Sequence, residues 1–497
     1  MNGNELLALA PLLIVFALAM LAVILDIFVP GRDRPVTIVT VGGLLVAMAV
    51  TAYAAATFGA EGQEVFDGSY VRDGLTSFLD LLFLAIALLT VLFSPDYLRP
   101  RRLPMAEFSS TLLFAISGAM LLGASRDLLV LFLALELLVL PGYMLAGYAK
   151  RDGLSTEGAI KYFLLGSFSS AIFLFGLALV WGYTGTTRIP AVAAALTGLD
   201  ATISLTPALT MGLALLTTGV AFKIAAVPFH YWTPDAYQGS PTPVTGYLSV
   251  GPKVAAFALI LRLFVDALAP LKADWTPFIV ILAAVTMTLG NLVALTQDNI
   301  KRMLAYSSIA HTGYILVGLA AYAASPVGSD TERAGLEALL FYSAAYAFMN
   351  LGAFAVVAAL QRRTGVTSQI TTFSGLGRRA PLLGGLMFLF LLSLTGIPPL
   401  AGFWAKVYVI LAALQAGDPW LTGLAVLTVI NAAAAAFYYL RIAVVMYMRD
   451  PSEQAPPVQL GGLLSAGLVL SAIATVAIGV APGLVIGFAQ EAARALL

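Results

Sequence analysis

The sequence contains no cysteine and only two histidines, His230 and His311. The absence of cysteine excludes a disulfide framework, an iron–sulfur cluster on thiolate ligands and a reactive thiol. Two histidines are too few for a His-rich metal or haem site. The sequence also lacks a Gly-rich phosphate loop, a dinucleotide fingerprint and the HExxH pattern of zinc enzymes. We therefore expect this chain to bind no metal or redox cofactor by itself.

Charged residues are also scarce. Asp, Glu, Lys and Arg together make up 10% of the 497 residues, whereas a soluble domain has about a quarter. Lys and Arg number 26, as do Asp and Glu, so the formal net charge is zero. With 60% hydrophobic residues, this composition excludes a soluble enzyme, a disordered protein and a nucleic-acid binder. It is typical of a membrane protein.

Apolar segments that could cross a bilayer recur along the whole sequence. A membrane-spanning helix needs about 20 apolar residues, and fourteen segments reach or approach that length. Their approximate limits are 5–29, 36–58, 74–94, 109–124, 127–148, 157–184, 206–234, 243–268, 277–296, 302–323, 334–360, 381–415, 419–448 and 460–488. Backbone groups in hydrocarbon must pair internally, and no segment alternates as barrel strands do. The sequence therefore predicts an all-α membrane protein with about fourteen transmembrane helices.

Cations in the loops predict the orientation. Fourteen Lys and Arg residues follow odd-numbered segments: Arg32, Arg34, Arg99, Arg101, Arg102, Lys150, Arg151, Lys301, Arg302, Arg362, Arg363, Arg378, Arg379 and Arg449. Five follow even-numbered segments: Arg72, Arg126, Arg188, Lys272 and Arg333. Because cytoplasmic loops are enriched in Lys and Arg, we expect the odd loops in the cytoplasm and both termini outside it.

Two segments contain prolines that a regular helix avoids. The seventh segment, 206–234, includes Pro228, and the twelfth, 381–415, includes Pro398 and Pro399. Proline removes a backbone donor and clashes with the preceding turn. We therefore expect each of these helices to break inside the membrane, close to a lysine.

The two broken segments suggest an internal repeat. Segments four to eight and nine to thirteen form two groups of five, and each group has its broken segment in fourth place. A five-helix unit crosses the membrane an odd number of times, so a second copy would be inverted, as in many transporters; two such helices among fourteen could also arise by chance. The predicted divisions are an N-terminal three-helix segment at 1–108, a first repeat at 109–268, a second repeat at 269–448 and a C-terminal helix at 449–497.

Six charged residues inside the predicted helices are candidates for a functional role, because a charge at mid-membrane costs roughly 2.5–3.5 kcal/mol on insertion scales. They are Asp80, Glu136, Lys161, Lys223, Lys253 and Lys406. Lys161 has Glu157 four residues before it, so a local ion pair explains it as well as a function does. Arg262 and Asp266 pair in the same way and carry no functional weight. Asp80 is compatible with polar packing.

Glu136, Lys223, Lys253 and Lys406 have no opposite charge three or four residues away. Their partners must therefore come from other helices or from water. Burial disfavours the charged forms of lysine and glutamate, and pairing favours them. A lysine whose carboxylate partner comes and goes can thus bind and release a proton. Several lysines with one glutamate are typical of a proton relay, whereas a selectivity filter needs rings of carbonyls or acids.

The histidines allow two interpretations each. His230, next to Pro228, could pass protons between Lys223 and Lys253 or satisfy the broken backbone. His311 could be polar packing or an element of the proton path. Four tyrosines could line a wet path, although aromatic packing is the simpler interpretation: Tyr342, Tyr346, Tyr438 and Tyr439.

The stretches around these residues resemble a known family. The sequence resembles the N-type antiporter-like membrane subunits of respiratory complex I, the proton-translocating NADH–quinone oxidoreductase, most clearly over 105–445. The family also includes the L and M subunits of that complex and the large subunits of multisubunit cation/proton antiporters. The most specific stretches are 136–161, 222–253, 291–313 and 394–406.

The resemblance implies fourteen helices, two inverted five-helix repeats and a broken helix in each repeat. It also implies a proton relay of six residues. These are the membrane glutamate Glu136, the central lysine Lys223, the connecting lysine Lys253, the second-channel lysine Lys406, a further family lysine Lys161 and the intervening histidine His230.

The implied function is proton translocation coupled to quinone reduction in a bacterial cell membrane, by a subunit with no redox site of its own. The resemblance places NADH, FMN, iron–sulfur clusters and quinone on other subunits. The implied partners are the other membrane subunits of the complex, including antiporter-like neighbours and small membrane subunits, together with the lipid bilayer and no nucleic acid.

Three other functions stay open at this point. The chain could be a subunit of a stand-alone multisubunit Na⁺/H⁺ antiporter on the same fold, a secondary transporter of an organic solute, or a scaffold that only holds the complex together. Redox partners or small antiporter subunits would distinguish the first, and solute uptake by the isolated chain the second. The isolated lysines argue against the third.

Overall fold

The computed structural model describes residues 2–28, 31, 33–59, 62–197, 206–362, 365–451, 458 and 460–497. Two of the fourteen cations that predicted the orientation, Arg32 and Arg363, lie outside the described residues. Within the described ranges the chain is an all-α membrane protein, as the sequence predicted, with one small β-hairpin.

The N-terminal part contains three long helices and the hairpin. Its elements are α1 (Gly3–Phe28), α2 (Asp33–Phe58), β1 (Gln63–Val65), β2 (Tyr70–Arg72), α3 (Gly74–Leu98) and the short 3₁₀ helix η1 (Arg99–Arg101). The two strands pair antiparallel, with Val65 opposite Tyr70. Asp73 caps α3 because its side chain accepts a hydrogen bond from the Thr76 amide.

The first group of helices follows. Its elements are α4 (Met105–Ala124), α5 (Leu128–Ala146), α6 (Gly153–Thr184), α7 (Ile189–Thr197), α8 (Pro207–Lys223), α9 (Trp232–Gly239), α10 (Thr242–Ile260), the π-helix η2 (Leu261–Ala267) and the 3₁₀ turn η3 (Ala269–Leu271). Aspartates cap α5 and α6, where Asp127 and Asp152 accept backbone hydrogen bonds from the first turn. The predicted break of the seventh segment is the gap between α8 and α9.

The second group has the same order of long elements. It comprises α11 (Lys272–Ala294), α12 (Ile300–Ala324), α13 (Asp330–Leu360), η4 (Ile370–Phe373), α14 (Leu376–Arg379), α15 (Pro381–Thr395), α16 (Ala401–Gln415) and α17 (Pro419–Met448). The predicted break of the twelfth segment is the gap between α15 and α16. Both groups thus run through two helices, a long helix, a broken helix and a final helix. This order is what the predicted repeat requires, and the inversion stays a prediction.

The C-terminal part differs from the prediction. The sequence predicted one helix over 460–488, but the structure has α18 (Gly462–Val480) and α19 (Gly483–Arg494). Pro482 stands between them, and a proline cannot continue the hydrogen bonding of the helix before it.

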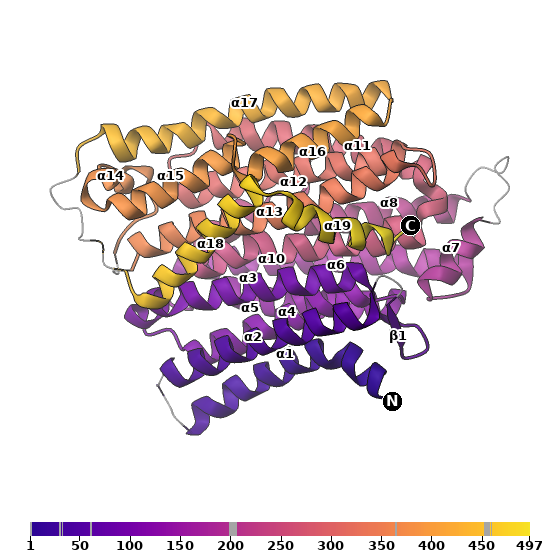
Figure 1. Cartoon of the computed structure of the whole chain (residues 1–497), viewed down its shortest axis with the longest axis horizontal. Helices are drawn as coiled ribbons and strands as arrows, with labels where there is room; N and C mark the ends of the chain where they lie inside the picture. Colours follow the sequence, from indigo (N-terminus) through magenta and orange to yellow (C-terminus); the bar gives the residue numbers. More distant parts are fainter. Residues whose placement is uncertain are drawn as a thin grey trace.

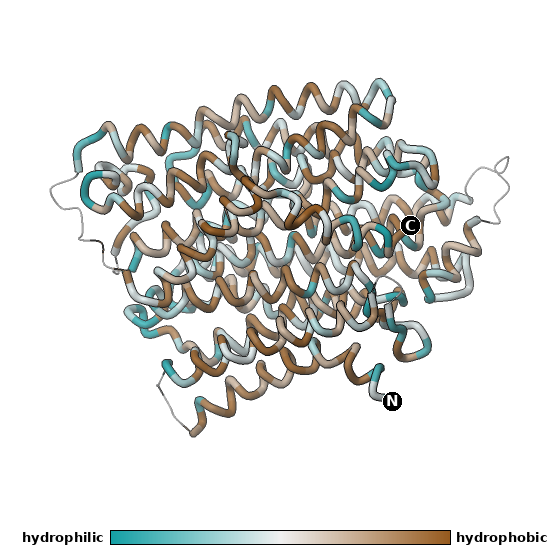
Figure 2. Tube along the Cα trace, in the orientation of Figure 1, coloured by the Kyte–Doolittle hydropathy of each residue, from teal (hydrophilic) through white to brown (hydrophobic). Residues whose placement is uncertain are grey.

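Of the described helices, twelve are long and apolar enough to cross a membrane. Counting α8–α9 and α15–α16 as one broken crossing each gives the fourteen predicted spans. Figure 1 shows the long helices running side by side from one end of the molecule to the other, with both termini at the same end. Hydrophilic residues gather at the two ends and hydrophobic residues in between (Figure 2). This pattern is that of an integral membrane protein.

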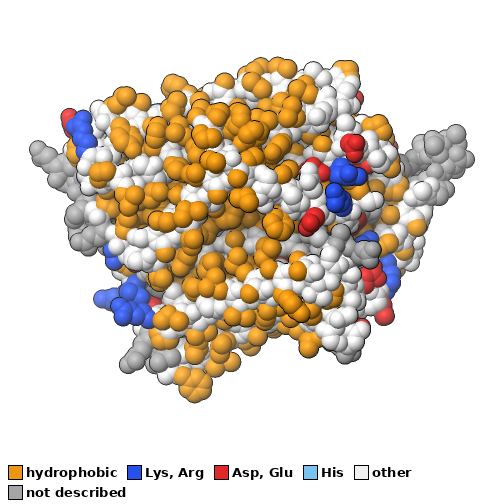
Figure 3. Space-filling model, in the orientation of Figure 1, with side chains coloured by type: hydrophobic (Ala, Val, Ile, Leu, Met, Phe, Trp, Pro, Cys, Tyr) orange, Lys and Arg blue, Asp and Glu red, His pale blue; other side chains and the backbone are white. Residues whose placement is uncertain are grey.

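The core lies around α10, α12 and α13, whose residues are almost all buried. Helices α1 and α2 form one edge of the bundle and α17 the opposite edge (Figure 1). One face of the molecule is covered with hydrophobic side chains in its middle, and its charged side chains lie toward the ends (Figure 3). Charged side chains placed among α10, α12 and α13 are therefore far from bulk water and need partners within the protein.

Candidate functional site: a line of buried lysines

The first break follows Lys223, the last residue of α8. Ala225 has a φ of 57°, a left-handed conformation that costs a residue with a side chain energy. Two threonines from the second group of helices hold this backbone. Thr286 Oγ1 accepts a hydrogen bond from the Val227 amide at 3.0 Å, and Thr312 Oγ1 donates one to the Ile224 carbonyl at 3.0 Å.

Lys223 is buried, with 7% of its surface exposed, and its Nζ donates to Ser170 Oγ on α6 at 2.9 Å. A cavity of about 10 Å³ adjoins it, lined by residues that include Tyr162, Phe222 and Trp232. Apart from Lys223, the lining consists of apolar and aromatic side chains.

Glu136 lies in the middle of α5, and its Oε1 is buried without a hydrogen-bond partner in the ranges that the structure describes. Among the residues that the structure describes, no ion pair joins Glu136 to Lys223. The structure thus places the two predicted partners in the same half of the molecule without bringing them into contact.

Lys253 lies on α10 with 3% of its surface exposed. Its Nζ donates to the Ser308 carbonyl at 2.8 Å and to Thr312 Oγ1 at 3.1 Å, both on α12. Thr312 is the residue that also holds Ile224 at the first break. Lys253 is therefore linked through one hydroxyl to the backbone that follows Lys223.

His311 lies on α12 and has its partners on α13 and α17, within the second group of helices. It is 1% exposed, and its Nδ1 lies 2.8 Å from the hydroxyl of Tyr342 on α13. Its Nε2 lies 3.3 Å from the hydroxyl of Tyr439 on α17, which in turn bonds to Ser307. A ring nitrogen with a hydroxyl on each side can take a proton on one side and give one on the other.

A polar network extends from this point toward α11 and α17. Tyr438 donates to Asn291 Oδ1 at 2.9 Å, and Asn291 Nδ2 donates to the hydroxyl of Tyr314 at 2.7 Å. The Tyr314 ring faces the Nζ of Lys406 at 5.5 Å from its centroid. Tyr342, Tyr438 and Tyr439, for which aromatic packing was the simpler interpretation, thus make buried hydrogen bonds within the core.

Lys406 lies on α16 beside the second break and is 5% exposed. Its Nζ donates to the carbonyls of Leu394 and Thr395, at 2.6 and 2.8 Å, which are the last residues of α15. A positive charge at a helix C-terminus is favourable because the carbonyls there point outward without intrahelical partners. Lys406 therefore joins the two halves of the broken helix.

His230 lies in the first break, 5% exposed, and stacks on Tyr231 with 4.7 Å between ring centroids. Its Nδ1 is buried without a hydrogen-bond partner in the described part of the chain. His311, rather than His230, makes hydrogen bonds with buried tyrosines, namely Tyr342 and Tyr439. The part of His230 in a relay stays a prediction.

Lys161 lies apart from the buried lysines. Its side chain is 43% exposed and forms ion pairs with Glu157 at 2.6 Å and Asp235 at 2.7 Å. Asp235 on α9 also pairs with Arg302 at 2.6 Å. The local pair with Glu157 is the one that the sequence suggested. The pair with Asp235 joins α6 to α9 and could not be predicted from local spacing.

Nearby, Lys301 is a buried lysine that the sequence analysis counted only as a loop cation. It is 3% exposed, and its Nζ donates to the carbonyls of Gln238 and Ser240 at the end of α9. Its position in the sequence, one residue after the start of α12, gave no signal of burial.

Two further buried charges belong to structural ion pairs. Asp80, one of the six candidates, lies 2.8 Å from Arg72 of β2. Arg72 also donates to Tyr70, whose pKa burial raises to about 12, so the phenol stays neutral and donates to the Ala8 carbonyl. Polar packing thus describes Asp80 correctly.

Arg262 forms the second structural pair, with Asp73 at 2.7 Å and Asp266 at 3.1 Å. It lies on η2, directly after α10, and joins this segment to the start of α3. The pair with Asp266 is the one that the sequence predicted, and Asp73 is an additional partner from a distant part of the chain.

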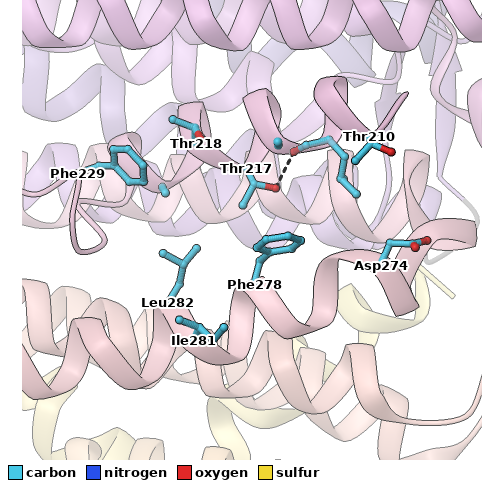
Figure 4. A pocket seen from close by; sticks show the side chains of 11 residues that line it. Thr210, Thr217, Thr218, Phe229, Asp274, Phe278, Ile281 and Leu282 are labelled. Carbon is cyan, nitrogen blue, oxygen red and sulfur yellow. Dashed lines mark hydrogen bonds between the residues drawn. The ribbon is translucent and has the colours of Figure 1, made fainter. Parts of the chain in front are cut away.

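A groove of about 620 Å³ runs between α8 and α11 (Figure 4). Thr210, Thr217 and Thr218 line one side, and Phe278 and Ile281 line the other. The groove reaches the first break at Phe229, but its lining includes none of the buried lysines. The groove is therefore separate from the buried lysines Lys223, Lys253 and Lys406.

In the part of the chain that the structure describes, no group of three or more His, Cys, Asp or Glu residues could hold a metal ion. The buried lysines have hydroxyls and backbone carbonyls as partners, and within the described ranges none of Lys223, Lys253 and Lys406 pairs with a carboxylate. Such partners accept hydrogen bonds from an ammonium group without cancelling its charge, so the charge on each lysine can change while the fold persists.

The chain is similar to known proteins over nearly its whole length. Residues 125–431 match the transmembrane family described as NADH:quinone oxidoreductase/Mrp antiporter. The chain is 40% identical to the NADH-quinone oxidoreductase subunit N of Trichlorobacter lovleyi, over 97% of this chain and 96% of the relative.

Solved structures give the same picture of the fold. A chain of respiratory complex I from Thermus thermophilus with bound aureothin is 35% identical, with a TM-score of 0.78 over 96% of this chain and 98% of that one. A chain of the Mrp complex from Dietzia sp. has a TM-score of 0.84 over 99% and 97% of the two chains. Its identity of 22% shows a shared fold alone.

Proposed function

Because the chain belongs to the NADH:quinone oxidoreductase/Mrp antiporter transmembrane family and is related over its length to subunit N of NADH-quinone oxidoreductases, we propose that it is the N-type, proton-translocating membrane subunit of such an oxidoreductase. The observation that carries the proposal is the line of three buried lysines, Lys223, Lys253 and Lys406, each bonded to uncharged groups. A charge buried without a counter-charge is costly. A role in proton transfer explains why lysines occupy these positions.

The proton path has three stages. Lys223 holds the proton in the first half of the molecule, where it lines a cavity together with Leu135 and Leu138, which flank Glu136 on α5. Lys253 receives it at the centre, and His311 with Tyr439 passes it toward the second half. Lys406 exchanges it at the second break. His230, buried in the first break, assists the transfer between Lys223 and Lys253, and the half-exposed Lys161 is a supplementary group.

Glu136 and Lys223 form the variable pair. Lys223 rests on Ser170, and Glu136 has an unsatisfied carboxylate oxygen. A change of charge in a neighbouring subunit, caused by quinone reduction, alters the attraction between the two and thereby the proton affinity of Lys223. This arrangement couples a redox reaction elsewhere to proton movement here.

The remaining parts of the reaction belong to other subunits. NADH, FMN, iron–sulfur clusters and quinone bind elsewhere in the complex, and this chain contributes the translocase part of the enzyme. Its partners are other membrane subunits, including antiporter-like neighbours and small membrane subunits. The membrane is a bacterial cell membrane, with both termini outside the cytoplasm.

The alternative is a subunit of a stand-alone Na⁺/H⁺ antiporter, which the family description and the shared fold with an Mrp complex keep open. Native gels distinguish the two. The tagged chain, extracted from its own membranes in mild detergent, should migrate with NADH–quinone reductase activity. A small band without redox activity would transfer the proposal to the antiporter.

Replacement of the central lysine tests the proton path itself. Lys223→Met should abolish proton pumping by the assembled complex in membrane vesicles, because methionine fills the same space and cannot carry a proton. Lys150→Met, in an exposed loop, is the matched control. Assembly is verified on the same native gel. Undiminished pumping by an assembled Lys223→Met complex would contradict the proposal.

A further inference from the structure

Thr312 on α12 contacts both Lys253 and the backbone that follows Lys223. Its Oγ1 accepts a hydrogen bond from Lys253 Nζ at 3.1 Å and has two carbonyls to which it can donate, Ile224 at 3.0 Å and Ser308 of its own helix at 3.2 Å. The Ser308 carbonyl already accepts from Lys253 Nζ at 2.8 Å, so Ile224 is the acceptor that depends on Thr312. Ile224 follows Lys223 directly and is the residue that ends α8. All these groups are buried, with Thr312 and Ile224 each 1% exposed.

The Ile224 carbonyl needs this hydrogen bond. It lies at the end of α8, where the helix offers it no further amide, and the chain then turns through Ala225 at a φ of 57°. A buried carbonyl without a partner is unfavourable, because it has lost its hydration and gained no hydrogen bond in exchange. On the other side of the turn, Thr286 holds the Val227 amide. The break behind Lys223 is therefore fixed by two hydroxyls, of which one also contacts a lysine.

A hydroxyl has a single hydrogen to donate. While Lys253 is an ammonium group, its nitrogen has no lone pair, so Thr312 can only accept from it and directs its own hydrogen to Ile224. When Lys253 is a neutral amine, its lone pair becomes an acceptor for the Thr312 hydrogen. The hydroxyl then turns about its C–O bond, and the Ile224 carbonyl loses its partner. This rotation involves no proton transfer between the two groups.

We propose that Thr312 is a positioning residue that transmits the charge of Lys253 to the broken helix behind Lys223. With Lys253 charged, the break is held; with Lys253 neutral, it is released. The inference rests on the proposed function, in which Lys223 supplies the next proton. Release of the break would couple the protonation state of Lys253 to the backbone that follows Lys223. Its structural content is independent of pumping and can be measured separately.

Other titratable side chains belong to the helices packed against α10 and could affect the same measurement. They are Asp80 on α3, Glu136 on α5, Lys223 on α8, Tyr237 on α9, His311 on α12 and both Tyr342 and Tyr346 on α13. His311 directly precedes Thr312 on α12. A variant without the amine, Lys253→Met, assigns any pH effect to Lys253 itself.

The test is hydrogen–deuterium exchange of the peptide that covers 220–232, in the assembled complex reconstituted in lipid nanodiscs. Exchange is measured from about pH 6 to about pH 10, between the usual pKa values of histidine and lysine. The ratio of each variant to wild type at the same pH cancels the intrinsic effect of pH on exchange. The peptide over the second break, 394–402, reports on any general loosening.

Thr312→Val removes the hydroxyl and keeps the shape. Its exchange should exceed wild type by about three- to tenfold at low pH, as expected for the loss of one buried hydrogen bond, and equal wild type at high pH, where the wild-type break is already released. Lys253→Met should equal wild type at low pH and exchange about three- to tenfold more slowly at high pH. The double variant should behave as Thr312→Val, and Thr312→Ser as wild type.

Two results would overturn the proposal. A constant ratio of Thr312→Val to wild type at every pH would mean that Thr312 only supports the backbone. A Lys253→Met ratio of one throughout would mean that Lys253 does not control the break. Neither result depends on proton pumping, so failure of this inference is distinguishable from failure of the proposed function, which the Lys223→Met pumping assay tests.

Discussion

At the scale of single residues, the sequence identified the buried lysines but not their partners. Lys223, Lys253 and Lys406 stand out because no opposite charge lies within a helical turn of them. Their hydrogen-bond partners include residues far along the chain, 53 positions away for Lys223 and 55 for Lys253. These partners are hydroxyls and carbonyls, which are too common in a sequence to indicate a site.

The two histidines show the same limit. His230 attracted attention because it lies among prolines and aromatic residues at a break, and His311 because it lies in a polar stretch of a helix. The structure places His311 between hydroxyls of Tyr342 and Tyr439. Those tyrosines come from helices 31 and 128 positions away, and only the packing of α12 between α13 and α17 brings them together.

Removal of one hydroxyl tests the part of His311. Tyr439→Phe should lower the rate of proton pumping by roughly 100-fold, the lower end of the range for loss of a positioned proton-transfer group. The phenyl ring still fills the space, so assembly should be unchanged. Tyr447→Phe on the same helix, half-exposed near its end, is the control. Pumping measured in vesicles at equal complex content decides the matter, and a wild-type rate would exclude Tyr439 from the path.

At the scale of elements, proline carried most of the predictive information. Pro228 and Pro399 lie in the two breaks, at the positions where the sequence analysis expected them. Pro482 indicated a further break near the C-terminus. The prediction of one helix over 460–488 did not take this proline into account. The β-hairpin at 63–72 could not be predicted in this way, because strands of three residues carry too little pattern.

The second break depends on a close approach of α15 and α16. Lys406 bonds the last carbonyls of α15, and the Gly402 amide donates to Ser393 Oγ at 3.1 Å. A Cβ at Gly402 would collide with the backbone carbonyl of Ser393. Only glycine permits this contact, since backbone atoms cannot give way as a flexible side chain can.

Gly402→Ala should therefore destabilise the assembled chain by about 1–3 kcal/mol, the usual cost of overpacking. It should also separate Lys406 from α15 and reduce pumping. Gly423→Ala on α17, where a Cβ meets nothing within 4 Å, is the matched control. Thermal unfolding of the purified complex measures the effect on stability. Equal unfolding temperatures for the two variants would show that the two helices can move apart without cost.

At the scale of the whole molecule, the helices place polar residues at two ends and apolar residues between them (Figure 2). Both termini lie at one end, together with β1 and α7 (Figure 1), which agrees with an even number of crossings. Figure 3 shows apolar side chains across the middle of one face, and the edge helices α1, α2 and α17 expose many more. Lipid or neighbouring subunits are the environment such edges require.

The absence of cysteine makes the orientation testable with single introduced thiols. Phe66→Cys lies in the hairpin turn at the end that carries the termini, and Arg151→Cys lies in the loop before α6. Because the odd loops carry fourteen cations and the even loops five, and cytoplasmic loops retain Lys and Arg, the hairpin should face outward. A membrane-impermeant maleimide should then label Phe66→Cys in right-side-out vesicles and Arg151→Cys in inside-out vesicles. The reverse pattern would place the termini in the cytoplasm, and the proton path would have to be read in the opposite direction across the membrane.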